Sequence, residues 1–425
     1  MKKDLNWMRL DNAALIFPAA RRRKWINAYR VSAYLKEDVD SDMLDIAIRH
    51  AVKRFPSMAV RIRTGFFWYY LEEIPSPPLS APEDEHQMNI FSWKEIRKCS
   101  IRVLYYKNRV SVEYFHSITD GNGAMIFLKN LVAEYIRIKY RVGIPPEHGI
   151  VDMNGPPLPG ELEDSFSKNA INYSSAEKQK DVFMLKGRRE PYGKLDLITG
   201  TVDSEELHSL ARSYRASVTE FLTALLLKCF IDIQERTSGS RKRKNVGVFI
   251  PVNLRKLFGS ATVRNFISYI TPQVDPNLGD YTLEELAGIV RNTFALKNNR
   301  KYFAGKFSDN VMLTRNLLLR MAPLPLKNIR MKAVYNRIGE KKSCICLSNL
   351  GKISLPDEMV PYVDRLDFIL GSQADCPINC SALCYNGRTN INFVRTIAEP
   401  VLEREFFTAL RKLGLHVFIE SNQQN

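Results

Sequence analysis

The hydrophobic period of the chain changes on either side of residues 116–121. Upstream, residues 110–115 (Val-Ser-Val-Glu-Tyr-Phe) alternate between the two sides of an extended backbone, which predicts a half-buried strand. Downstream, apolar side chains recur at helical spacing between residues 124 and 136, which predicts a helix. The residues between them, His-Ser-Ile-Thr-Asp-Gly, therefore form a strand-to-helix turn that two regular elements hold rigidly. Such a turn is a suitable place for a general base.

The length of 425 residues exceeds what one compact core usually organises, so we expect two domains. A hydrophobic fraction of 45% and a charged fraction of 25% are typical of a globular protein. The longest apolar run, around residues 221–227, ends at Lys228 and is far shorter than the roughly 18 residues of a membrane span. No apolar stretch follows Lys2 and Lys3, so we expect no secretory signal and a cytoplasmic protein.

The predicted elements fall into two halves with a similar order of strands and helices. In the first half, a helix capped by Asp40 ends before Pro56, and strands are predicted at 27–35, 58–63, 66–73, 100–106 and 110–115. In the second half, helices are predicted after Asp203 and at 221–233, 283–296 and 401–413, and strands at 196–202, 246–252, 266–274, 344–347, 367–370, 381–385 and 390–394. Turn-forming residues accumulate between these halves. We therefore expect an α+β fold, a two-layer sandwich in each half, with an N-terminal subdomain over 1–165, a crossover linker over 166–195 and a C-terminal subdomain over 196–425.

The seven cysteines cannot all pair, and in a chain without an export signal we expect them to be reduced. Cys344 and Cys346 are two positions apart, and three further cysteines lie at intervals of four between residues 376 and 384. Structural zinc prefers Cys-x-x-Cys pairs, often with histidines, and the C-terminal region has only His416. We therefore predict no metal site and interpret the cysteines as small apolar residues buried in strands.

The net charge of +16 raises the possibility of a nucleic-acid partner. The charges are scattered, however, and the dense runs at 21–24 and 241–244 are not interleaved with aromatic residues that stack bases. We therefore predict no nucleic-acid binding. The two runs are interpreted either as solvated loops or as attractors of an anionic partner, such as the phosphates of coenzyme A or an acidic carrier protein.

Histidine suits general base catalysis at neutral pH because its ordinary pKa is about 6.5. Of the six histidines, five have a simpler explanation on a predicted helix surface or in a loop: His50, His86, His148, His208 and His416. His116 alone follows an apolar strand and begins a rigid turn. It is the predicted base.

The sequence His116-x-x-x-Asp120-Gly121 is the signature of the chloramphenicol acetyltransferase-like acyltransferases, and the chain resembles their alcohol acetyltransferase and peptide-condensation branches. The resemblance implies two domains of the chloramphenicol acetyltransferase type, with an active site in a tunnel at their interface. It implies His116 as general base, acyl-CoA as co-substrate and no bound cofactor or metal. It also implies that Asp120 points away from the histidine and pairs with an arginine; Arg255 is the predicted partner and Arg264 the alternative. Gly121 then either tolerates a positive φ or leaves room for substrate.

Two further segments are similar to stretches near the active site of this family. Residues 262–266 carry Asn265, the predicted polar residue beside the tunnel, and residues 347–351 form a Leu-Ser-Asn-Leu-Gly turn. In that turn either Ser348 or Asn349 donates to the oxyanion, or both only cap strand ends.

The sequence also departs from two branches of the family. Of the Asp-Phe-Gly-Trp-Gly motif found in plant-type acyltransferases, only Asp367-Phe368 remains, and Phe115 stands where many condensation domains have a second histidine. Both departures favour a free-standing alcohol acetyltransferase.

The resemblance therefore implies transfer of an acyl group, in the first interpretation an acetyl group, from acyl-CoA to a small alcohol. Two alternatives stay open. One is ester or amide condensation, in which an acyl carrier protein brings the donor in trans and an amine can be the acceptor. The other is a binding protein that has the fold but no turnover.

Overall fold

The computed structural model of the chain describes residues 6–22, 25–83, 88–171, 173, 179–191, 193–238, 243–316, 320–339 and 341–422. Several residues discussed above lie outside this part: His86, two members of each basic run (Arg23, Lys24, Arg241 and Lys242) and positions 172, 174–178 and 192 of the predicted linker. In the described ranges, no helix has the length and hydrophobicity that a membrane span requires.

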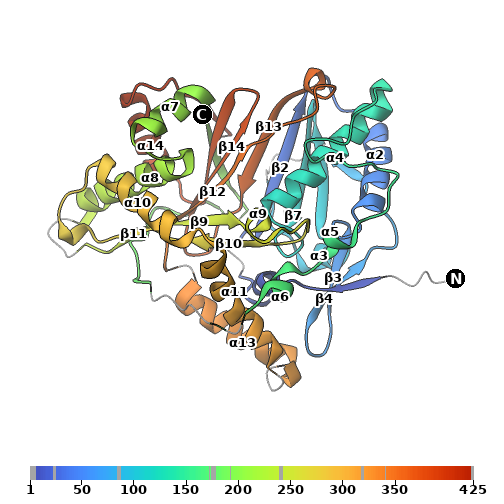
Figure 1. The fold of residues 1–425 in the computed structure, drawn as a ribbon, viewed down its shortest axis with the longest axis horizontal. Coiled ribbons are helices and arrows are strands. Elements are labelled where there is room, and N and C mark those ends of the chain that lie inside the picture. Colours follow the sequence, from blue (N-terminus) through green and yellow to red (C-terminus); the bar gives the residue numbers. More distant parts are fainter. Residues whose placement is uncertain are drawn as a thin grey trace.

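The first sheet has the strand order β13-β2-β7-β6-β5 (Figure 1). Its strands are β2 (Ala28–Leu35), β5 (Ser80–Pro82), β6 (Ile101–Tyr106), β7 (Arg109–Phe115) and β13 (Val363–Leu370). Helices α2 (Ser41–Arg54) and α4 (Gly121–Tyr140) pack against each other, and α4 also packs on β2 and β7. Their apolar side chains and those of the sheet form one hydrophobic core. The predicted strand at 110–115 and the helix after it are confirmed as β7 and α4.

A smaller sheet with the order β1-β4-β3 adjoins this half. Its strands are β1 (Trp7–Arg9), β3 (Val60–Thr64) and β4 (Tyr69–Glu73). The strand predicted from residue 66 begins only at Tyr69, because Gly65 N–H donates to the carbonyl of Trp68 at 2.9 Å and closes a turn between β3 and β4.

The second half contains the large sheet, with the order β10-β9-β12-β14-β15-β8-β16 and β11 beside β9. Its strands are β8 (Asp196–Asp203), β9 (Val246–Asn253), β10 (Ile267–Ile270), β11 (Gln273–Val274), β12 (Ile345–Lys352), β14 (Ile378–Tyr385), β15 (Arg388–Arg395) and β16 (Phe418–Ser421). The strand predicted at 266–274 is divided into β10 and β11 around Pro272, which has no N–H to donate to a ladder.

Helices α7 (Ser204–Ser213), α8 (Val218–Ser238), α10 (Leu283–Lys297) and α14 (Val401–Lys412) pack beside this sheet (Figure 1). The predicted central helix is confirmed as α8, whose residues from Phe221 to Leu227 are almost all buried on every side. It contacts α7, α10, α14 and β9, so it is the inner helix of a second hydrophobic core.

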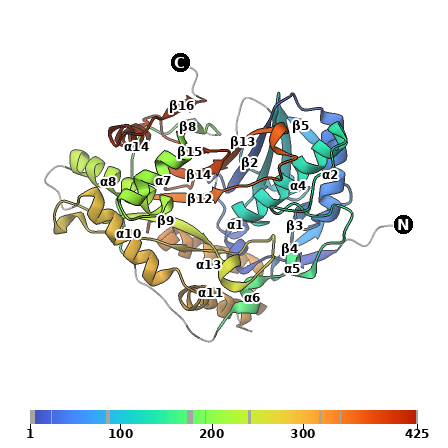
Figure 2. The ribbon, with the colours of Figure 1, turned by 45° about the horizontal axis from the view of Figure 1, so that its top comes forward.

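The two sheets do not follow the predicted boundary at residue 196. Strand β13 lies in the predicted C-terminal range, yet it pairs antiparallel with β2 along its whole length and completes the first sheet. Side chains of the second sheet also bond to β13: Ser381 Oγ donates to the Phe368 carbonyl at 2.6 Å, and Asn392 Nδ2 to the same carbonyl at 3.0 Å. In Figure 2 the strands β13, β14 and β12 lie next to one another where the two sheets meet. The assignment of all of residues 196–425 to a separate subdomain is therefore wrong for β13.

Helices α11 (Arg300–Arg315) and α13 (Leu324–Val334) were not predicted, because charged residues and prolines interrupt their apolar spacing. They project at the lower edge of Figure 1. The remaining short elements are η1 (Asn12–Leu15), α1 (Ile16–Ala19), α3 (Trp93–Ile96), α5 (Pro159–Leu162), α6 (Ser165–Asn169), α9 (Arg255–Phe258), η2 (Pro276–Leu278), η3 (Tyr335–Gly339) and η4 (Val360–Tyr362).

Candidate active site

The turn between β7 and α4 is fixed by bonds to two other segments. His116 N–H donates to the Asn27 carbonyl at 3.1 Å, and Ser117 Oγ donates to the Ala14 carbonyl at 3.2 Å. Tyr29 Oη donates to the Thr119 carbonyl at 2.8 Å. The turn is therefore held from the sheet and from the N-terminal segment at once.

The imidazole of His116 lies between two aromatic rings and is half-buried. The ring of Phe17 is stacked on it, with centroids 4.3 Å apart and an interplanar angle of 10°, and the ring of Tyr29 meets it edge-on at 4.9 Å. Among the described residues, the buried Nδ1 of His116 has no hydrogen-bond partner. The ring is thus positioned by packing, and no carboxylate of the described residues is hydrogen-bonded to it.

Burial lowers the pKa of the His116 imidazole below its ordinary value, although its own backbone carbonyl and the charge of Asp120 act in the opposite direction. An imidazole with a lowered pKa is neutral at physiological pH. It can accept a proton, which is what a general base requires.

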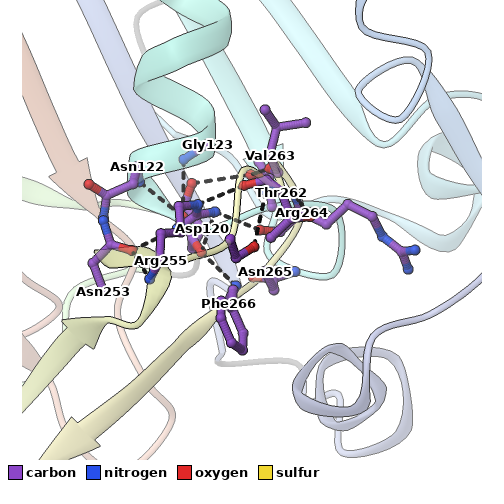
Figure 3. Close-up of polar contacts among 12 residues, drawn as sticks. Asp120, Asn122, Gly123, Asn253, Arg255, Thr262, Val263, Arg264, Asn265 and Phe266 are labelled. Carbon is purple, nitrogen blue, oxygen red and sulfur yellow. Dashed lines mark hydrogen bonds and ion pairs between the residues drawn. The ribbon is translucent and has the colours of Figure 1, made fainter. Parts of the chain in front are cut away.

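Asp120 is fully buried and its carboxylate is satisfied at both oxygens (Figure 3). Oδ1 accepts from the backbone N–H groups of Asn122 at 3.1 Å and Gly123 at 3.0 Å, so Asp120 is the N-cap of α4. Oδ2 accepts from Phe266 N–H at 2.8 Å and lies 3.0 Å from Arg255 Nη2. The carboxylate therefore joins the start of α4 to the second half of the chain.

Arg255 and Arg264 have different carboxylate partners, and of the two it is Arg255 that pairs with Asp120. Arg255 Nε donates to the carbonyl of Thr262 and Arg255 Nη2 to that of Arg264, both at 2.7 Å, so this guanidinium holds the segment 262–266 as well as Asp120. Arg264 Nη2 instead lies 2.7 Å from Asp11 Oδ1.

Two glycines at the start of α4 are in tight surroundings. Gly121 is the first helical residue and its φ is not positive, so the interpretation that this glycine serves to tolerate a positive φ is wrong. A Cβ at Gly121 would lie 3.0 Å from Phe368 Cζ and 3.1 Å from Leu350 Cδ2. At Gly123 it would lie 2.1 Å from the carbonyl oxygen of Val263 and 2.2 Å from Thr119 Oγ1. The segment 262–266 thus packs directly on the backbone of Gly123, a requirement that the sequence analysis missed.

The other predicted site residues lie around the same turn with different partners. Asn265 Nδ2 donates to the His116 carbonyl at 3.4 Å. Asn349 is engaged in its own turn, since Nδ2 donates to Thr219 Oγ1 at 3.0 Å and Oδ1 accepts from Gly351 N–H at 2.8 Å. Ser348 is half-buried, and in the described part of the chain its hydroxyl has no partner. Of the two candidates in this turn, Ser348 has the hydroxyl that is available to a ligand.

A cavity of about 1640 Å³ brings these residues together. His116, Gly121 and Asn122 line it from the first half of the chain, and Ser348 and Asn349 line it from the second. Phe17, Trp25 and Tyr29 contribute an aromatic wall next to the imidazole.

The cavity is strongly basic. Among the described residues that line it, the cations are Arg9, Lys256, Lys306, Arg315, Arg320, Lys327, Arg330 and Lys352, and the carboxylate is Asp164. Four of these cations lie in one segment between residues 315 and 330, and the other four come from distant parts of the chain, so the fold brings the set together. By contrast, the described members of the two basic runs do not line the cavity. One of them, Arg22, lies 2.7 Å from Asp375.

In the parts of the chain that the structure describes, no group of three or more His, Cys, Asp or Glu side chains is arranged to hold a metal ion. None of the seven cysteines, all of which lie in the described ranges, forms a disulfide.

No family model matches this sequence, and no curated protein sequence is similar to it at a significant level. Solved structures with the same fold are nevertheless found over almost the whole length. The structure of polyketide synthase associated protein 5 from Mycobacterium tuberculosis matches with a TM-score of 0.61 and 14% identity, over 96% of each chain. That of F. graminearum TRI101 complexed with coenzyme A and T-2 mycotoxin matches with a TM-score of 0.65 and 11% identity, over 98% of this chain and 100% of the other. The trichothecene 15-O-acetyltransferase TRI3 from Fusarium sporotrichioides matches with a TM-score of 0.57 and 11% identity, over 96% and 94%. At these identities the comparisons establish a shared mixed α/β fold.

Proposed function

We propose that the protein transfers an acyl group from acyl-CoA to the hydroxyl of an alcohol, with His116 as general base. The observation that carries this proposal is a half-buried imidazole with a lowered pKa in the wall of a large basic cavity. The imidazole takes the proton of the hydroxyl as its oxygen attacks the thioester carbonyl. The tetrahedral intermediate then expels the thiolate of coenzyme A, which takes the proton back from the imidazolium, so that the ester, the free thiol and the neutral base remain.

In this mechanism Asp120 and Arg255 act on the scaffold. Their ion pair and the cap on α4 hold the turn that carries His116, and Asn265 bonds to the backbone of the histidine itself. Ser348 is the proposed donor to the oxyanion, because its hydroxyl is unengaged and lies in the cavity wall. Gly121 keeps the first turn of α4 small where Leu350 and Phe368 approach.

The cavity has room for two substrates. At about 1640 Å³ it exceeds the roughly 300–1,000 Å³ of ordinary small-molecule sites. Its cations match the phosphates of coenzyme A. We propose that it forms a tunnel between an N-terminal subdomain (1–165) and a C-terminal one (196–425 without β13), joined by the crossover 166–195. The TRI101 structure with coenzyme A and T-2 mycotoxin, and the acetyltransferase name of TRI3, support this assignment by fold.

The test is release of free thiol from a panel of acyl-CoA donors, each combined with alcohols and with amines. His116→Ala is compared with His208→Ala, because His208 is an exposed histidine on α7 and lies outside the cavity. We expect acceptor-dependent thiol release that falls about 10²- to 10⁴-fold in His116→Ala and persists in His208→Ala. Equal turnover in both variants would remove His116 from the chemistry. Turnover only with a carrier-protein-bound donor would show that an acyl carrier protein, and not coenzyme A, supplies the acyl group. Binding of acyl-CoA without turnover would identify the protein as a binding protein.

A further inference from the structure

Helix α13 and the tip of the β3–β4 hairpin expose large apolar side chains to solvent. On α13, Leu326 is 61% exposed and Ile329 is 68% exposed. Next to the helix, Met321 is 64% exposed, and Phe66 in the hairpin is 71% exposed. Large apolar groups gathered in this way on a protein surface mark an interaction site.

The two faces of α13 have different surroundings. Leu324, Asn328 and Met331 follow helical spacing and line the cavity described above. Leu326 and Ile329 are also three positions apart, but they do not line the cavity and point to solvent. Helix α13 therefore has apolar side chains on the side that lines the cavity and a second apolar edge outward, and packing within the described part of the chain does not explain that outward edge.

The tip of the β3–β4 hairpin is bonded to the start of α13, and the two elements lie side by side (Figure 1). Leu324 N–H donates to the carbonyl of Phe66 at 2.9 Å, and Lys327 Nζ donates to that of Phe67 at 2.8 Å. Asn328 Nδ2 donates to Tyr69 Oη at 2.7 Å. We call this surface the docking face and define it by its apolar members Phe66, Trp68, Met321, Leu326 and Ile329, of which Trp68 also lines the cavity.

The chain segment that contains α13 carries positive charge alone. Residues 310–339 include Lys or Arg at 315, 320, 327, 330, 332 and 337, and no Asp or Glu. Of these, Arg320, Arg330 and Lys332 are exposed, and Arg320 and Arg330 also line the cavity described above. An apolar face flanked by cations matches the surface of a bilayer that contains anionic lipids.

We propose that the docking face binds reversibly to the surface of an anionic lipid bilayer. Leu326, Ile329 and Phe66 enter the region between headgroups and acyl chains, Trp68 lies at the level of the headgroups, and the neighbouring cations contact anionic headgroups. A bilayer fits this surface, because apolar groups from two separate elements are exposed together and exposed cations lie in the same segment of the chain. The proposal does not depend on the acyltransferase activity, because it concerns only the binding of the protein to a bilayer.

The test is co-sedimentation of the full chain with two kinds of vesicle. One kind contains phosphatidylcholine alone, and the other contains roughly 3 parts phosphatidylserine to 7 parts phosphatidylcholine, which gives about the negative charge of a cytoplasmic leaflet. We expect binding to the anionic vesicles and weak binding to the neutral ones. Leu326→Glu and Ile329→Glu should each weaken binding by at least about tenfold, because each removes a buried apolar group and adds a repelled charge. Leu278→Glu is the matched control, since Leu278 is 81% exposed in η2, away from the docking face.

Charge is tested in the same assay. The pair Arg330→Glu/Lys332→Glu should weaken binding to anionic vesicles by more than about fivefold per residue, whereas Arg411→Glu/Lys412→Glu in the exposed last turn of α14 should have little effect. Binding that survives Leu326→Glu and is lost only at high salt would show unspecific adsorption and overturn the proposal. Failure to bind either vesicle would overturn it too, and if the chain then bound a purified acidic carrier protein through Leu326 and Ile329, the surface would be a protein interface.

Discussion

The carboxylate of Asp120 lies 3.0 Å from Arg255 Nη2, and this ion pair connects the first turn of α4 to the segment that follows β9. Both side chains are buried, and each has further partners: backbone N–H groups for the aspartate and backbone carbonyls for the arginine. The pair is therefore a joint between the two halves of the chain at the base of the histidine turn. It leaves His116 without a carboxylate to orient it.

Removal of either charge from this joint should destabilise the fold. Asp120→Asn and Arg255→Ala each leave the other charge buried without the opposite charge of the ion pair, although its bonds to backbone groups remain. The loss is on the order of 3 to 5 kcal/mol when burial is complete. We expect each variant to lower the melting temperature. The double variant Asp120→Asn/Arg255→Ala should lose less than the sum of the two single losses, because the two residues interact directly. Thermal or urea unfolding of the four proteins measures this coupling.

The outcome also separates two roles of the aspartate. An orienting role would leave Asp120→Asn stable but inactive, because the amide is nearly isosteric with the carboxylate. Strict additivity in the cycle, or a stable and inactive Asp120→Asn, would contradict the structural role.

The pH dependence of turnover should report the environment of His116. Because burial lowers its pKa from the ordinary value, the neutral base persists below about pH 6.5, and kcat/KM should fall only at more acidic pH as the imidazole is protonated. The free energy of unfolding should also decrease as the pH falls. The reason is that the unfolded chain binds this proton at a higher pH than the folded chain, so the unfolded state is favoured as the pH falls through the ordinary pKa of histidine.

Phe17 provides the variant for this measurement. Its ring covers one face of the imidazole, so Phe17→Ala admits water and should move the acidic limb of kcat/KM toward the ordinary pKa of histidine. Phe91→Ala is a control for lost aromatic volume, since Phe91 is buried in the same half but does not touch His116. An unchanged limb in Phe17→Ala would exclude His116 as the group that titrates.

Capture of acyl-CoA should depend on the cations of the cavity. The KM for acyl-CoA should rise with ionic strength far more than the KM for a neutral alcohol, because exposed attractions are screened over about 10 Å at 0.1 M salt. Lys256→Gln and Lys352→Gln, at two exposed cavity lysines, should raise the KM for acyl-CoA and reduce its salt dependence. Lys53→Gln removes an exposed lysine of α2 that does not line the cavity, and it should change neither. An equal rise of the KM for acyl-CoA in all three variants would mean that the net charge of the protein, and not the cavity lysines, determines capture of acyl-CoA.

Sequence reasoning reached the parts of the site that lie close together along the chain. The change of hydrophobic period around residues 116–121 predicted β7, the turn and α4, because local periodicity reflects one buried face. The cations of the cavity and the stacking of Phe17 on His116 depend on contacts between distant segments, which no local pattern encodes. Strand β13 was predicted as an element but not as a member of the first sheet, since the edge that a strand joins is decided by tertiary packing.

The two glycines at the start of α4 should differ sharply in their tolerance of a methyl group. Gly121 belongs to the sequence pattern that predicted the base. The atoms that a Cβ would meet there, Phe368 Cζ and Leu350 Cδ2 at 3.0 and 3.1 Å, are nevertheless ends of side chains that can shift. At Gly123 the Cβ would lie 2.1 Å from a backbone oxygen of Val263, and moving it would displace the segment that bonds to Asp120.

We therefore expect Gly123→Ala to destabilise the protein by at least the roughly 1 to 3 kcal/mol of an overpacked core, despite the gain of about 1 kcal/mol from replacing a helical glycine. Gly121→Ala should change the free energy of unfolding much less, because the helical gain offsets a small shift of Phe368 and Leu350. Urea unfolding of the two variants side by side measures the difference, and Gly288→Ala in α10, where a Cβ meets nothing within 4 Å, calibrates the helical gain alone. If Gly121→Ala were the more damaging variant, the close approach of residues 262–266 to α4 would not be what requires glycine in this turn.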